Sequence, residues 1–206
     1  MIRNTPQKVS HPMMKSPKLL SRSLALAICL ILTSVVAQAQ YKIHALTGAI
    51  TVVHPKIQMT TIATDDGTPG SFEWLAKVGG AVDFDKNISN GTVTPDQLIT
   101  KDSQVIAFYF GTGSVRTLVA LRDLGTAPLI KAMGIALRYN KKAHQLTIMN
   151  MEGAEETFQL DAKTVTDTDT GVSANFKYDF QKNEQVRVLA IKGAASENAL
   201  LIVPAY

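Results

Sequence analysis

A pattern of residues in the first half of the chain recurs 86 positions later, and this internal repeat constrains the fold more than any other feature. Residues 61–72 read T-I-A-T-D-D-G-T-P-G-S-F, and residues 147–158 read T-I-M-N-M-E-G-A-E-E-T-F. Thr, Ile, Gly and Phe keep their places at one separation (147 − 61 = 86). Agreement without a gap indicates a tandem duplication, so the chain is expected to contain one structural unit twice.

Each copy of the repeat has the pattern of a β-hairpin. Gly67 and Gly153 stand between two runs of strand-like residues, where glycine supplies the positive φ that a tight turn demands. Gly48 and Gly134 begin the strand in front of each hairpin, again 86 positions apart. The acids beside the turn glycines are therefore assigned to folding first and to ligand binding second.

The remainder of each copy predicts further strands. Residues 101–105 match residues 182–186 at a separation of 81 (182 − 101), so about five extra residues fall in the first copy, in the loop 78–95. Helix is expected to be scarce, with residues 94–99 as its best candidate. About five short strands in each copy predict an all-β chain of two tandem small antiparallel barrels. We expect them at residues 40–124 and 133–206, joined by a linker at residues 125–132.

The first 39 residues have the layout of a cleavable export signal. A basic leader without acids precedes an apolar run at residues 24–36, which is shorter than the roughly 20 residues that span a bilayer. Ala37 and Ala39 place small residues at an expected cleavage site, so the mature chain is predicted to begin at Gln40. Met1, Met13 and Met14 remain alternative starts.

Removal of this signal changes the charge balance. Five of the 21 Lys and Arg residues lie in the leader, so 16 remain against 17 acids and the mature net charge is about −1. The basic pI of 9.1 thus belongs to the leader and gives no support to nucleic-acid binding. The lone cysteine, Cys29, also lies in the signal, and Ile28 before it disfavours a lipoprotein site, where a small residue is expected.

The second copy resembles a broad group of small exported bacterial β domains of unknown function. The resemblance is strongest over residues 133–204. The residues that carry it are Gly134, Thr147-Ile148, Glu152-Gly153, Phe158, residues 161–164, residues 185–188 and residues 199–202. These positions are structural, a turn glycine and core apolar residues. The resemblance implies an OB-like small barrel outside the cytoplasm, and it brings no catalytic residues with it.

Motifs for catalysis are lacking. The sequence contains neither G-x-S-x-G nor H-E-x-x-H, and the histidines after the leader, His44, His54 and His144, have no metal-ligand spacing. Residues 167–171 begin like a calcium loop, but Gly171 comes one residue early and Tyr178 occupies the position of the bidentate Glu. We therefore expect no enzyme and no cofactor, and we assign this acidic run to a strand edge.

A soft-metal site is the alternative that the methionines raise. Met149 and Met151 are two residues apart on an expected strand, so both side chains should share one face, and His144 precedes them. Thioethers suit Cu(I). The competing interpretation is packing, because methionine is a common gap filler.

Aromatic residues are the candidates for ligand contact. Phe108, Tyr109 and Phe110 are consecutive on an expected strand, so at least one ring should face away from the core. Phe176 and Tyr178 alternate with Phe180 and should share a face. We select Tyr109, Phe176 and Tyr178 as candidate ligand-binding residues, with burial between the two copies as the alternative.

The sequence therefore predicts an exported protein, periplasmic or extracellular, without a membrane span once the signal is cleaved. It is expected to act without catalysis, binding a ligand or a protein partner that the residues do not specify. A periplasmic Cu(I) carrier is the alternative function.

Overall fold

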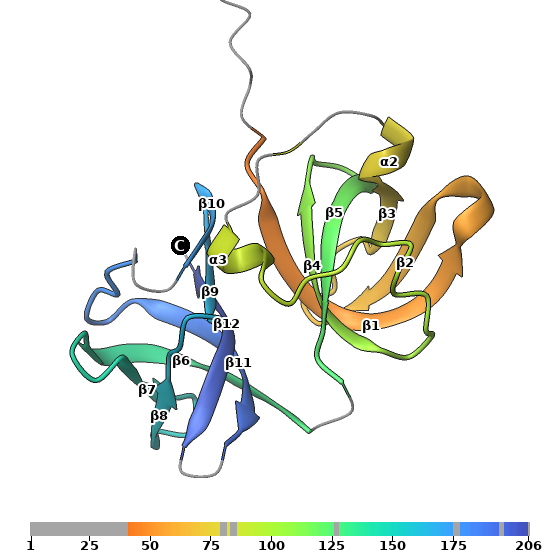
Figure 1. Cartoon of the computed structure of the whole chain (residues 1–206). Helices are drawn as coiled ribbons and strands as arrows, with labels where there is room; N and C mark the ends of the chain where they lie inside the picture. The colour runs from red at the N-terminus through yellow and green to blue at the C-terminus, as the bar shows by residue number, and fades with distance from the viewer. Residues whose placement is uncertain are drawn as a thin grey trace, which may run out of the picture. The chain divides into compact units, whose positions relative to one another are not determined.

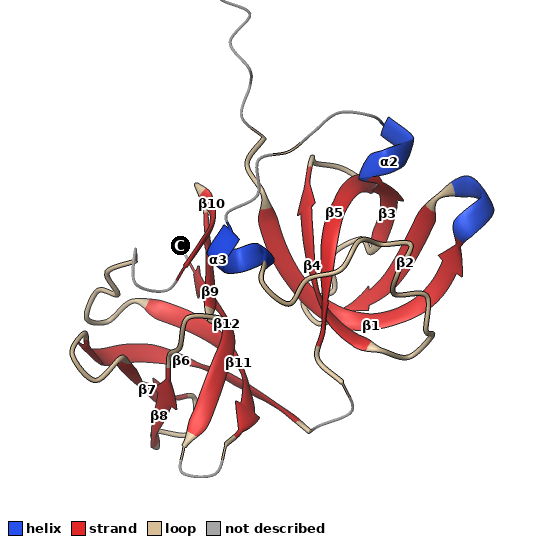
Figure 2. Ribbon diagram, viewed as in Figure 1, coloured by secondary structure: helices blue, strands red, loops and turns tan. Residues whose placement is uncertain are grey.

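The computed structural model describes residues 41–78, 82, 86–125, 128–174, 178–193 and 196–205, which all belong to one compact unit, Gln40–Tyr206. The expected signal segment lies outside the described residues. Strands make up most of the regular structure (Figure 2). The described helical segments are single turns, η1 (Pro55–Ile57), α2 (Leu75–Val78) and α3 (Lys86–Ser89). The all-β prediction is confirmed.

The first half of the unit forms a closed barrel, here called the first barrel. Its strands follow the order β1-β2-β3-β5-β4, and β1, the long curved strand in Figure 1, pairs with both β2 and β4. The pairs are antiparallel except β3 with β5, which is parallel. The bounds are β1 (His44–His54), β2 (Met59–Thr64), β3 (Ser71–Trp74), β4 (Gln104–Phe110) and β5 (Val115–Asp123).

The second half repeats this topology strand for strand, and its five repeated strands are here called the second barrel. The ring of pairings runs β6-β7-β8-β12-β11 and returns to β6, with the parallel pair β8–β12 in the place of β3–β5. The bounds are β6 (Leu129–Asn140), β7 (Gln145–Asn150), β8 (Glu155–Gln159), β11 (Gln185–Lys192) and β12 (Glu197–Ala205). A hairpin of β9 (Val165–Thr168) and β10 (Gly171–Ala174) is added, and β9 pairs with β12.

Irregularities in the sheets recur at the separations found in the sequence. The bulge of β1 between Ile50 and Val52 is matched by a bulge of β6 between Ala136 and Arg138, 86 positions later. The bulge at Val119 of β5, opposite Phe108 and Tyr109, has its equivalent at Leu200 of β12, opposite Leu189 and Ala190, 81 positions later. Bulges bend and twist a strand, so the duplication has preserved the curvature of the barrel wall.

Two pairs of repeated glycines have separate structural reasons. Gly67 and Gly153 have φ of 73° and 84° and complete the predicted hairpin turns. Gly48 and Gly134 lie in strands, and a Cβ there would lie 2.3 Å from the Ala63 carbonyl oxygen and 2.2 Å from that of Met149. The first two strands of each barrel thus approach too closely for any side chain.

The apolar residues form three clusters, one inside each barrel and one between the barrels. Phe72 and Phe158, which the repeat aligns, are fully buried in the first and second barrel cores. The third cluster joins residues of both halves, among them Phe108 from β4 and Val165, Leu189 and Leu201 from β9, β11 and β12. The barrels therefore share an apolar interface.

Hydrogen bonds also stabilise the interface between the barrels. The buried guanidinium of Arg122, on β5, donates from Nη2 to the Ile88 carbonyl oxygen and from Nη1 to that of Lys163, each at 2.6 Å. The amide nitrogen of Val172, on β10, donates to the Ile43 carbonyl oxygen at 2.7 Å. Arg122 and Val172 thus cross-link the two halves of the chain.

Two predictions about the segments between strands were wrong. The strand β6 begins at Leu129, inside the predicted linker, because its first residues pair with β11 from Leu129 opposite Ile191 onward. The expected helix at residues 94–99 is a single turn, in which the Gln97 amide donates to the Thr94 carbonyl oxygen. Val93 forms a bridge with Leu121 just before it, and this holds the chain extended.

Among the described residues, no helix combines the length and the apolar character needed to cross a membrane.

Candidate functional site: a cavity between the two barrels

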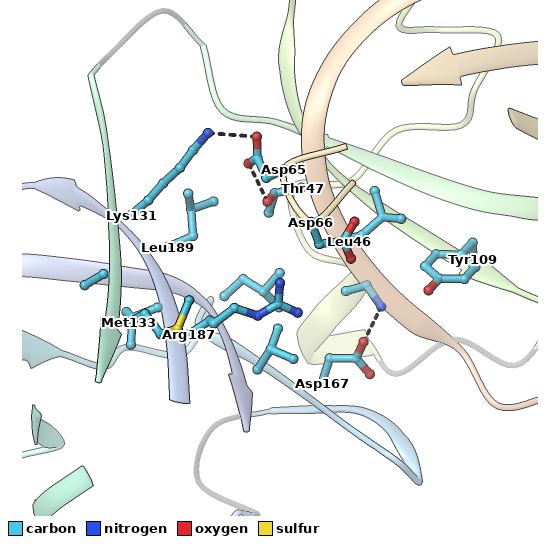
Figure 3. A pocket seen from close by; sticks show the side chains of 15 residues that line it. Leu46, Thr47, Asp65, Asp66, Tyr109, Lys131, Met133, Asp167, Arg187 and Leu189 are labelled. Carbon is cyan, nitrogen blue, oxygen red and sulfur yellow. Dashed lines mark hydrogen bonds and ion pairs between the residues drawn. The ribbon is translucent and has the colours of Figure 1, made fainter. Parts of the chain in front are cut away.

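A cavity of about 400 Å³ opens between the barrels (Figure 3). The first barrel contributes β1, the turn after β2 and Tyr109 of β4, and the second half contributes β6, β9, β11 and β12. Leu46, Val188, Leu189 and Leu201 supply apolar surface, while acids and bases of both halves supply charge. A concave site with an apolar wall and a few polar groups is the form that small-molecule sites usually take.

Strand alternation explains how β6 offers polar side chains to this cavity. Ile130 and Ala132 pack against the second barrel core, so Lys131 and Met133 point away from it. Lys131 Nζ lies 2.7 Å from Asp65 Oδ1, and Thr47 Oγ1 donates to Asp65 Oδ2 at 2.6 Å. Because both charged side chains are partly exposed, this ion pair contributes at most about 1 kcal/mol, but it neutralises one acid of the cavity wall.

Asp167 is the most buried acid of the lining, at 7% exposure, although it lies on the short strand β9. Its carboxylate accepts a hydrogen bond from the Ala45 amide at 2.9 Å and pairs with His44 Nδ1 at 3.0 Å. The hydrogen bond to Asp167 is the main cause of a raised pKa at His44, partly opposed by burial. Asp167 therefore holds the start of β1 against β9.

Asp66 and Arg187 carry the two charges of the lining that are joined in no ion pair within the described residues. Burial raises the pKa of Asp66, but hydrogen bonds from Thr68 and the charge of Arg187 outweigh it, so the net shift is downward. The Thr68 amide donates to Asp66 Oδ1 at 3.0 Å, and the Thr68 hydroxyl donates to the same oxygen at 2.8 Å. At neutral pH the cavity thus presents a carboxylate and a guanidinium.

Tyr109 separates the cavity from the interior of the first barrel. Its ring packs on Phe72 with centroids 5.5 Å apart, and the Arg116 guanidinium carbon lies 4.4 Å from the Tyr109 ring centre. Burial raises the pKa of the Tyr109 hydroxyl, and the Arg116 charge opposes that shift. The tyrosine stays neutral and can donate a hydrogen bond into the cavity.

Of the three predicted ligand-binding aromatics, the two that the structure describes do not form one platform. Tyr109 lines the cavity, Phe176 lies outside the described residues, and Tyr178 packs against the second barrel core. The Tyr178 ring contacts Phe180 at 4.9 Å, and its hydroxyl donates to the Glu184 carboxylate. Tyr109 and Tyr178 thus lie apart, because their rings pack against the cores of different barrels.

The predicted metal ligands are also separated. Strand β7 ends at Asn150, so Met151 lies in the following turn, 77% exposed, and does not share a strand with Met149 as the sequence predicted. His144 precedes the other end of β7, in a turn with φ of 52°. Met149 follows His144 by five positions, which corresponds to about 17 Å along an extended strand. His144 cannot join the methionines around one ion.

A search of the described residues for three or more His, Cys, Asp or Glu side chains arranged around a common point finds no such group.

Three charged residues that line the cavity from the second half were not predicted from the sequence: Lys131, Asp167 and Arg187. They are 66, 102 and 122 positions away from Asp65 in the chain (131, 167 and 187 minus 65), and nothing in local spacing connects them. One signal was present. The Thr/Asp run 166–168 was visible in the sequence, and the structure shows that it is buried, with Asp167 paired to His44 and Ala45 and the Thr166 hydroxyl without a hydrogen bond to the described residues.

The chain matches no protein-family model and no curated protein. Among solved structures, silver-bound CusF is similar over 38% of this chain and 99% of that chain, with 10% identity and a TM-score of 0.30. A copper(II)-bound CusF variant from Escherichia coli covers 40% of this chain and 98% of its own, with 11% identity and the same TM-score. Such a TM-score supports no conclusion on fold or function, so the assignment of the site rests on its own geometry.

Proposed function

We propose that this protein is an exported, non-catalytic binding module, which takes a small ligand bearing both a positive and a negative group in the cavity between its barrels. One observation carries the proposal. A cavity of about 400 Å³ with apolar walls presents the carboxylate of Asp66 and the guanidinium of Arg187, and neither belongs to an ion pair within the described residues.

The other charges of the cavity support this choice of ligand. Lys131 is paired with Asp65, and Asp167 is paired with His44, so these four groups are matched without a ligand. Asp66 and Arg187 attract each other, and the Arg187 charge adds to the Thr68 hydrogen bonds in lowering the pKa of Asp66. A ligand with an ammonium and a carboxylate satisfies both, whereas an ion of one sign would meet repulsion at one end.

The absence of catalysis is part of the proposal. The His–Asp pair at the site, His44 with Asp167, is used to join β1 to β9, and the ring of Tyr109 lies near the histidine, with ring centroids 6.1 Å apart. Burial raises the pKa of the Tyr109 hydroxyl, which makes it a weak nucleophile. The pair is thus better suited to positioning than to activating a hydroxyl.

Thermal unfolding of residues 40–206 with a panel of amino acids and betaines, each at 10 mM, tests the proposal. At least one member should raise the melting temperature, and its affinity should fall about tenfold or more in Asp66→Asn and in Arg187→Gln, since each change removes a charged partner. Asp96→Asn and Arg138→Gln, outside the cavity, should bind like the wild type. A panel without any stabilising member, or equal loss in the control variants, would refute the proposal.

A second candidate is Cu(I) binding by exposed thioethers on the outer face of β6 and β7. Met149 is paired with Ile135, so Met133, two residues earlier on the same face of β6, is its diagonal neighbour. Met133 and Met149 are 44% and 37% exposed, and Met151 follows in the turn. Three soft ligands within reach of each other suit Cu(I) without His144.

A titration with Cu(I) against a chromogenic chelator separates this candidate from the first. Micromolar or tighter binding that is lost in the double variant Met133→Leu with Met149→Leu, and kept in Met59→Leu, would establish the copper function. Binding that is absent or unchanged in the double variant removes it.

A further inference from the structure

Arg116 lies inside the first barrel and has no acidic partner among the described residues. It is the second residue of β5, two positions before the core residue Leu118, so its side chain points to the same interior. Only 7% of the residue is exposed. A buried guanidinium without a counter-charge is costly, which makes its surroundings informative.

Two aromatic rings lie side by side against the guanidinium. Its central carbon lies 4.7 Å from the ring centre of Phe72 and 4.4 Å from that of Tyr109. Such cation–π contacts stabilise the charge in part, by up to about 2 kcal/mol when they are desolvated. They leave the N–H groups at the edge of the guanidinium unsatisfied.

One edge of Arg116 is unpartnered. Nε and Nη2 are both buried and make no hydrogen bond to the described residues. These two nitrogens lie on the same side of the guanidinium, and together they form the fork that binds a carboxylate through two parallel hydrogen bonds. Arg122, the other buried arginine of β5, uses both of its terminal nitrogens on carbonyl oxygens.

We infer that the Nε–Nη2 edge of Arg116 is a binding site for a monocarboxylate inside the end of the first barrel, behind the ring of Tyr109. A carboxylate is planar and matches the two parallel N–H donors of this edge. Asp66 and Asp167 both act on the Tyr109 hydroxyl by their charge. Their proximity disfavours a dianion such as phosphate.

Tyr109 is the side chain that can admit the anion. Phe72 is fully buried, whereas Tyr109 is half-buried and lines the cavity between the barrels. The loop 111–114 beside it is exposed throughout. A rotation of the Tyr109 ring, which packs at the margin of this core against Phe72, would open the Arg116 edge toward the cavity. This site is independent of the zwitterion proposed for the cavity.

The test observes Arg116 directly. In ¹H–¹⁵N spectra of the labelled wild-type protein, the Arg116 Nε–H signal should shift with sodium acetate and saturate in the millimolar range. Sodium chloride at equal ionic strength should leave it unmoved, and phosphate should act more weakly. Arg116→Lys, which keeps the charge and loses the fork, should weaken acetate binding about tenfold or more. Arg138→Lys, on the surface, should change nothing.

Three results would overturn the inference. They are an Nε–H shift that never saturates, a shift that chloride reproduces, and undiminished acetate binding in Arg116→Lys. If Arg116→Lys does not fold, the wild-type titration decides alone. Acetate binding should persist in Asp66→Asn and Arg187→Gln, so failure of this site and failure of the cavity proposal are distinguishable.

Discussion

Replacement of Arg122 by methionine removes the guanidinium that forms hydrogen bonds at the interface between the barrels. The methionine keeps an unbranched side chain over Phe108, whose ring centre lies 5.6 Å from the guanidinium carbon. The variant loses two hydrogen bonds, to the carbonyl oxygens of Ile88 and Lys163. Hydrogen bonds from a charged donor contribute about 1.5–3 kcal/mol each. Arg122→Met is therefore expected to destabilise the folded protein.

Two opposing effects set the size of this loss. The contact with Ile88 is buried, so its carbonyl stays unpaired in the variant, whereas the contact with Lys163 is partly buried and its carbonyl can regain water. The variant also relieves the desolvation of the arginine, which lowers the pKa of Arg122 in the folded protein. The free energy of unfolding should fall by about 2–4 kcal/mol, mainly through the orphaned Ile88 carbonyl.

Urea denaturation at pH 7, followed by circular dichroism and by fluorescence, measures this change. Arg138→Met is the matched control, because the Arg138 side chain is 70% exposed and lies 3.9 Å from Glu155. It should cost less than about 0.5 kcal/mol. A loss below about 1 kcal/mol in Arg122→Met would refute the stabilising role of the two hydrogen bonds of Arg122.

Three further changes have defined outcomes. The pKa of His44 is raised in the folded state, so the stabilisation from Asp167 should be complete below about pH 6.5 and should decline as pH rises through the folded pKa. Urea midpoints measured from pH 5 to 9 should show this decline. The decline should be lost in His44→Gln. Gly48→Ala and Gly134→Ala should each lower the free energy of unfolding by about 1–3 kcal/mol in urea denaturation, because each new Cβ atom would clash with a carbonyl oxygen. Unequal or negligible losses would contradict the structural equivalence of the two glycines. Thr60→Val removes the hydroxyl that accepts the hydrogen bond of the Trp74 indole at 2.8 Å, and it should lower the free energy of unfolding by about 1–2 kcal/mol. Urea unfolding can be followed by the fluorescence of this single tryptophan. An unchanged urea midpoint would show that another acceptor replaces the hydroxyl.

The architecture was predictable because the duplication left local signals. The hairpin glycines Gly67 and Gly153 and the buried Phe72 and Phe158 keep their spacing, since each must satisfy the same turn or core position in both barrels. The order of the strands was not readable from this spacing. The parallel closures of β3 with β5 and of β8 with β12 depend on segments far apart in the chain.

The site was predictable only at Tyr109. Cavity residues such as Asp167 and Arg187 acquire their roles from contacts between the two barrels, and no pattern within one copy of the repeat contains those contacts. The methionines failed for a different reason. The strand was expected to continue through Met151, but Asn150 ends it by accepting the amide hydrogen bonds of Glu152 and Ala154 at its side chain.

The charged residues that pair across the cavity differ between the two copies. Lys131 and Asp167 belong to the second half, and each pairs with a residue of the first, Asp65 or His44. The repeated framework supplies two barrels, and the unrepeated charges supply the cavity between them. The proposed function therefore assigns ligand recognition to the interface and not to the inside of the second barrel.

The central claim, that the cavity binds a zwitterionic ligand, is tested most directly by an NMR titration of the labelled protein with the best stabiliser from the amino-acid and betaine panel. If the ligand binds in the cavity, the amide chemical shifts of the residues around it should change and saturate, at Thr47, Asp66, Ala132 and Val188. Shifts confined to the outer face around Met149, or to the exposed loop 111–114, would contradict it.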